Sequence, residues 1–167
     1  MTLNYIAEKS FVASLEVTNT DYPNPVGTWE FKPGYNGTTQ WLTSSWLTTS
    51  RAGHAPVKLW FGAVMQAEGE YAYEIRPWND RNRRVDISTH DFLGFYARTE
   101  SAAPLWRIKS EGGSLVRITT LAGKAVGTYW DNAAWTSGRR GSYLRVGAVP
   151  AALFEIHGIQ IGVAEPR

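Results

Sequence analysis

Apolar and polar residues alternate in short runs along most of the chain, and the 3.6-residue spacing of an amphipathic helix is rare. Many of the apolar positions hold β-branched or aromatic side chains, which favour the pleated surface of a strand. About twelve such runs, at the roughly 8–12-residue spacing of all-β domains, predict strands. The predicted strands span residues 11–17, 28–32, 39–47, 57–64, 71–76, 84–88, 93–98, 105–109, 114–120, 125–130, 142–146 and 153–161.

Turn-forming residues separate these runs. Groups of Gly, Pro, Asn, Asp and Ser lie at 22–25, 34–37, 78–80, 111–113 and 136–138. Residues 63–70 favour a short helical turn. Strands and turns account for the rest, so the sequence predicts one all-β domain over residues 1–167.

Similar peptides recur along the chain at separations of 44 to 48 residues. The Leu-Trp pair at 59–60 recurs at 105–106 and corresponds to the Leu-Phe pair at 153–154. Three four-stranded units of this length predict a β-trefoil with pseudo-threefold repeats, in which six strands form a barrel and three hairpins cap it. In such a fold each unit contributes one large apolar side chain to a shared core, and here these would be Trp60, Trp106 and Phe154. The alternative architecture is a two-sheet β-sandwich.

Residues 105–124 contain a Trp-X-Ile strand, a Gly-Gly turn and a second strand followed by Gly123-Lys124. This arrangement resembles the strand–turn–strand signature of β-trefoil lectins, and the resemblance covers the second and third units best. The Gln-X-Trp triplet of the ricin-type branch is absent, because Gln40 directly precedes Trp41. The resemblance implies a binding protein, most often for carbohydrate, although protease inhibitors also adopt this fold.

The composition narrows the possible chemistry. The chain has no cysteine, which excludes disulfides, thiolate zinc sites and cysteine nucleophiles. It contains eight Trp and eight Tyr, and arginine is its main cation, which favours recognition surfaces. The formal net charge is only +2, so we expect no nucleic-acid partner.

No apolar run approaches the roughly 18 residues of a membrane span. The first residues lack the basic start and long apolar stretch of a secretory signal. We therefore expect a cytoplasmic protein, or one that is released without a classical signal peptide.

Three predicted turns place an aromatic residue beside Asn or Asp, roughly one turn per proposed unit. An aromatic face covers the apolar side of a pyranose, and Asn or Asp can hydrogen-bond its hydroxyls. The candidate sugar-binding residues are Tyr35 and Asn36; Trp78, Asn79 and Asp80; and Trp130, Asp131, Asn132 and Trp135. The structural alternative is that each aromatic covers a sheet edge while Asn or Asp closes an Asx turn.

Other polar motifs favour structural roles. The arginines within 81–84 and at 139–140 could contact anions, but neighbouring Asp80 and Asp86 favour local ion pairs. His54, His90 and His157 lack metal-ligand spacing, and we find no catalytic or nucleotide-binding motif. The sequence therefore predicts a non-enzymatic protein with no metal and no cofactor.

The leading hypothesis is a lectin that binds glycans or glycoconjugates through shallow loop sites. Such sites are individually weak, so repeats or a homodimer would add avidity. The alternative hypothesis is a protease inhibitor or toxin-like protein that acts through exposed loops, such as residues 21–27, on a protein or membrane target.

Overall fold

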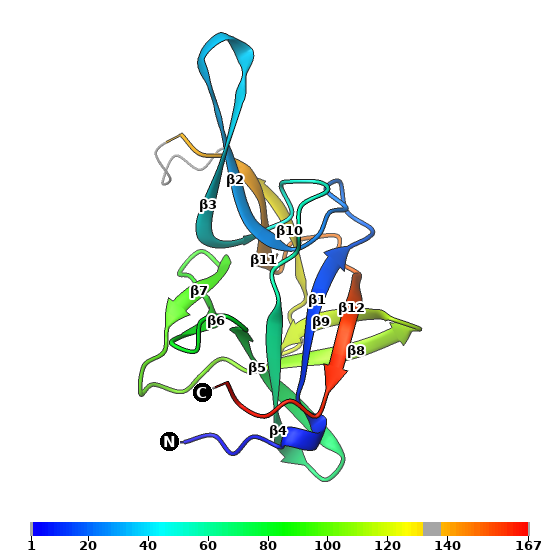
Figure 1. The fold of residues 1–167 in the computed structure, drawn as a ribbon. Coiled ribbons are helices and arrows are strands. Elements are labelled where there is room, and N and C mark those ends of the chain that lie inside the picture. The colour runs from blue at the N-terminus through cyan, green and yellow to red at the C-terminus, as the bar shows by residue number, and fades with distance from the viewer. Residues whose placement is uncertain (1, 132–137, 167) are drawn as a thin grey trace.

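The computed structural model describes residues 2–131 and 138–166, and strands dominate it (Figure 1). The strands are β1 (Phe11–Val17), β2 (Gly27–Pro33), β3 (Thr39–Thr48), β4 (Leu59–Ala67), β5 (Glu70–Pro77), β6 (Arg83–Ile87), β7 (Leu93–Ala97), β8 (Trp106–Gly112), β9 (Leu115–Thr120), β10 (Val126–Asp131), β11 (Gly141–Val146) and β12 (Phe154–Ile161). Two short 3₁₀ turns, η1 (Ala7–Lys9) and η2 (Tyr35–Gly37), complete the regular elements of the described residues. The prediction of an all-β protein is confirmed.

The helical turn predicted at residues 63–70 is wrong. Residues up to Ala67 extend β4, which pairs with β5 in antiparallel register from Leu59 opposite Pro77 to Val64 opposite Ala72. Gly69 has a φ of +76°, which allows the chain to reverse tightly between the two strands. The hydrogen bonds of this hairpin therefore outweigh the local helical preference.

The strands form two antiparallel sheets. In the first, β1, β12, β9, β8, β5 and β4 are hydrogen-bonded in that order, and β1 also pairs with β4, so the pairing closes into a ring. In the second, the order is β10-β11-β3-β7-β6, with β2 paired to β3. This second sheet consists of three hairpins, β2–β3, β6–β7 and β10–β11, and the β2–β3 hairpin projects from the body (Figure 1).

The main apolar core brings together side chains from both sheets. Trp106 and Phe154 lie in it, fully buried, as the repeat pattern predicts. Trp60 is also fully buried, but it packs outside this cluster against Tyr5. Successive side chains of a strand point to opposite faces, and in β4 it is Leu59 and Phe61 that enter the core. The prediction that Trp60 joins Trp106 and Phe154 in the shared core is therefore wrong.

No helix in the described part of the chain has the length and apolar character needed to cross a membrane.

Candidate functional site

A cavity of about 420 Å³ lies beside the β6–β7 hairpin and β3, and we call it the aromatic cavity. Its lining residues are Trp46, Ile87, Ser88, Thr89, His90, Phe92 and Tyr96. Trp46 makes edge-to-face contacts with Phe92 and with Tyr96, at centroid distances of 6.4 and 6.2 Å. The cavity therefore has aromatic walls with two hydroxyl-bearing side chains and one imidazole beside them.

The loop between β6 and β7 shapes this cavity through its own hydrogen bonds. The Ser88 hydroxyl accepts the backbone N–H groups of His90 at 3.3 Å and Phe92 at 3.0 Å. The Ser88 N–H donates to the carbonyl of Phe92 at 2.8 Å, and Asp91 takes a φ of +70° that closes the turn. Thr89 and His90 are exposed at the tip of this turn.

Residues packed behind the cavity lining hold Phe92 and His90 in place. Phe92 is buried and packs edge-to-face on Tyr143, whose hydroxyl donates to the Glu30 carboxylate at 2.5 Å. The Arg145 guanidinium lies over the Phe92 ring at 5.3 Å, and its Nε donates to the carbonyl of His90 at 3.2 Å. These contacts hold both ends of the loop, which keeps the cavity preformed.

Tyr96 supplies the most accessible aromatic surface of the cavity, with 37% of the residue exposed. Partial burial, and to a smaller degree the carboxylate of Asp86, raise the pKa of the Tyr96 phenol. The phenol therefore stays protonated at neutral pH and can both donate and accept hydrogen bonds.

The first of the predicted turns is confirmed at residues 35–37. Tyr35 is 93% exposed at the tip of the β2–β3 hairpin, and Asn36 and Gly37 both have a positive φ. Tyr35 also borders a cavity of about 560 Å³ lined by Lys32, Pro33, Gly34 and Gln40. Its ring is thus available to a ligand.

The second predicted turn, at Trp78, Asn79 and Asp80, follows β5. Trp78 is half-buried, and its backbone N–H donates to the carbonyl of Lys58 at 2.9 Å. The Asp80 carboxylate accepts the N–H of Asn82 at 3.0 Å and pairs with Arg83 at 3.3 Å. Asp80 therefore closes an Asx turn.

Trp130 and Asp131, which were predicted in the third turn, belong to β10. Trp130 lies opposite Ser142 in the β10–β11 ladder, and it is 38% exposed. Its ring stacks on Tyr22 at 5.1 Å with an interplanar angle of 11°, and it contacts Phe31 at 5.3 Å. Tyr22 thus covers part of the surface that was expected to meet a sugar. Asn132 and Trp135 lie outside the described residues.

The arginines at 83 and 84 form the local ion pairs that the sequence suggests, Arg83 with Asp80 at 3.3 Å and the buried Arg84 with Asp86 at 3.4 Å. Arg139 instead lies 3.4 Å from the buried carboxylate of Glu30, far away in the sequence.

A third cavity, of about 370 Å³, borders a buried ionic cluster on the first sheet. The Arg76 side chain is 0% exposed, and its guanidinium bonds Glu74 and Glu165, each at 2.9 Å. The Tyr5 hydroxyl donates to Glu74, and burial together with this bond raises the pKa of Tyr5. The cluster ties residues near both ends of the chain to β5, and it is best explained as a structural anchor.

No protein-family model, curated protein or solved structure matches this chain.

Proposed function

We propose that this protein is a β-trefoil lectin that binds a neutral sugar in the aromatic cavity. The observation that carries the proposal is the convergence of Trp46, Phe92 and Tyr96 around a cavity of about 420 Å³ edged by Ser88 and Thr89. Typical ligand pockets measure about 300–1,000 Å³ and combine apolar walls with a few placed polar groups.

The strand pairing supports the β-trefoil. In three consecutive units, β1–β4, β5–β8 and β9–β12, the first and last strands all belong to the closed ring of the first sheet. The middle strands of each unit form a hairpin of the second sheet. The sheets of a two-sheet sandwich have open edges. A trefoil instead places the outer strands of each unit in a closed barrel and the middle strands in a hairpin that caps it.

The lining chemistry favours a neutral sugar over a charged one. The ring of Tyr96 can cover the C–H face of a pyranose, while Ser88, Thr89 and the phenol can hydrogen-bond its hydroxyls. The described lining contains no lysine, arginine, aspartate or glutamate. A sialylated or sulfated glycan would leave its anionic group without a guanidinium or ammonium partner there. Our proposal is binding without catalysis, since the described lining offers no carboxylate pair for glycoside hydrolysis.

A glycan array with neutral and anionic members tests this proposal directly. We expect binding to neutral glycans that Tyr96→Ala weakens by about tenfold, the cost of one lost aromatic contact. Tyr35→Ala is the matched control, because it removes an exposed tyrosine at the tip of another hairpin. Binding that survives Tyr96→Ala but is lost in Tyr35→Ala would place the site on the β2–β3 hairpin instead. An absence of glycan binding would overturn the proposal.

The protease-inhibitor or toxin-like alternative has one structural observation in its favour. The loop at residues 21–27 is held by a hydrogen bond from the Val17 N–H to the Asn24 carbonyl at 3.0 Å. The Asn24 side-chain amide also donates to the Thr49 carbonyl at 2.8 Å. A loop fixed in this way would bind a protein target with little ordering cost. Protease inhibition or liposome leakage without any glycan dependence would favour this second function.

A further inference from the structure

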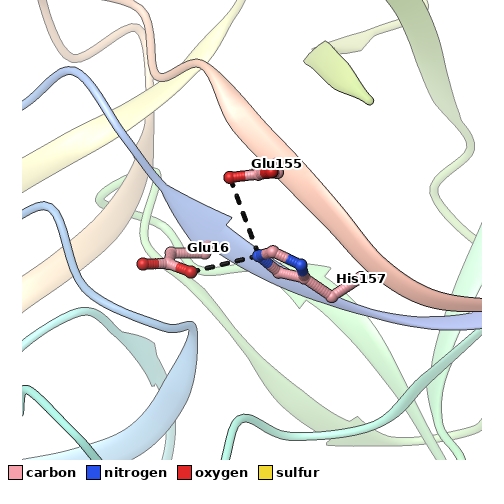
Figure 2. Close-up of side chains that lie close together, drawn as sticks. All are labelled: Glu16, Glu155 and His157. Atoms are coloured by element: carbon pink, nitrogen blue, oxygen red, sulfur yellow. Dashed lines mark hydrogen bonds and ion pairs between the residues drawn. The ribbon is translucent and has the colours of Figure 1, made fainter. Parts of the chain in front are cut away.

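Two glutamates face each other across the β1–β12 pair. Glu16 and Glu155 are directly opposite in the antiparallel register, and His157 lies two residues further along β12 on the same face. Figure 2 shows both carboxylates directed at the same imidazole nitrogen. The His157 Nε2 atom lies 3.1 Å from Glu16 Oε2 and 3.8 Å from Glu155 Oε2.

Like charges directly opposite each other on neighbouring strands are destabilising. Among the described residues, no lysine or arginine forms an ion pair with either Glu16 or Glu155. The Ser114 hydroxyl donates to Glu155 Oε1 at 3.4 Å, which leaves Oε2 directed at the imidazole. The register therefore places two carboxylates together without a permanent cation to offset their repulsion.

We propose that Glu16, Glu155 and His157 bind a divalent transition metal, with Zn²⁺ as the best fit. One ligand atom from each residue lies within 4.8 Å of the others. Tetrahedral zinc with ligand bonds of about 2.0–2.1 Å requires ligand atoms about 3.3 Å apart, and the two distances to His157 bracket this value. The three side chains are 38–45% exposed, so an ion can reach them and a water can complete the coordination.

The donor set discriminates between metals. Imidazole nitrogen is a good ligand for zinc, copper and nickel, whereas calcium and magnesium prefer six or more oxygen ligands. The cluster offers one imidazole nitrogen and two carboxylates, which suits zinc, copper or nickel better than calcium or magnesium. A bound ion would add a cross-link between β1 and β12, the first and last strands in the sequence, which already pair in the closed ring.

Calorimetric titration of Zn²⁺ into chelator-treated protein tests the site. We expect one saturable site per chain, with at least a tenfold loss of affinity in His157→Ala and in Glu16→Gln. His90→Ala is the matched control, because it removes an exposed imidazole outside this cluster and should leave the zinc affinity unchanged.

Co²⁺ provides a second readout, since a tetrahedral site gives intense visible absorption that His157→Ala should abolish. The proposal would be overturned by non-saturable binding, or by equal losses in His90→Ala and His157→Ala. Unchanged affinity in Glu16→Gln would also overturn it.

Discussion

Gly94 of β7 lies directly opposite Trp46 of β3, and a Cβ atom at Gly94 would approach the Trp46 ring to 3.0 Å. This is the one register pair between β3 and β7 in the described residues. The indole that forms a wall of the aromatic cavity therefore depends on the absence of a side chain on the facing strand.

Gly94→Ala should displace the Trp46 ring and narrow the aromatic cavity. Overpacking of this kind costs about 1–3 kcal/mol of unfolding free energy. We expect a lower midpoint in urea, together with weaker glycan binding. Wild-type stability would contradict the close approach of Gly94 to the Trp46 ring, and wild-type glycan affinity would contradict a role for this wall in binding.

Substitutions of Tyr96 should separate stacking from hydrogen bonding. Tyr96→Phe keeps the ring and removes the hydroxyl, so we expect only a few-fold loss of glycan affinity. Tyr96→Ala removes both and should cost about tenfold. Equilibrium titration with one neutral glycan compares the two variants, and an equal loss in both would assign the contribution of Tyr96 to its hydroxyl alone.

The buried ionic cluster should be sensitive to the loss of Arg76. Arg76→Met leaves the Glu74 carboxylate, 2% exposed, with only the more distant guanidinium of Arg98 at 3.9 Å, and we expect a loss near the lower end of about 3–5 kcal/mol. Glu165→Gln is the matched control, because the Glu165 side chain is 43% exposed and its ion pair should contribute less than about 1 kcal/mol. Urea denaturation measures both, and similar values for the two variants would contradict the structural-anchor role.

Tyr5 should make stability depend on alkaline pH. Burial, followed by the hydrogen bond to Glu74, raises the pKa of Tyr5 in the folded state above its ordinary value of 10.0. Above pH 10 the unfolded chain therefore loses the phenolic proton while the folded chain retains it, so the unfolding free energy falls as pH rises. Tyr5→Phe should show a shallower decline above pH 10 than the wild type. Parallel pH profiles would contradict this role for Tyr5.

Local patterns were sufficient to predict the strands. The buried positions Ala13, Leu15 and Val17 in β1, like Val116 and Ile118 in β9, follow the period of two that places side chains on one face of a strand. The same alternation explains where two predicted residues lie. It directs Trp60 away from the core that Leu59 and Phe61 enter, and Trp130 continues the strand predicted over residues 125–130 instead of lying in the turn after it.

The sequence alone could not predict the aromatic cavity, because residues far apart in the chain line it. Trp46 and Tyr96 come from different hairpins, and these hairpins meet through a single register pair. No local spacing encodes such a long-range contact. The Glu16, Glu155 and His157 cluster is similar, because its members are brought together by the pairing of the first and last strands.

Mapping of backbone amide shifts by NMR, during titration with a neutral glycan from the array, tests the central claim most directly. The account predicts that the largest saturable shifts fall on residues 88–96 and on Trp46, with little change around Trp78 and Trp130. Shifts centred on Trp130 or on Tyr35, with residues 88–96 unaffected, would contradict it.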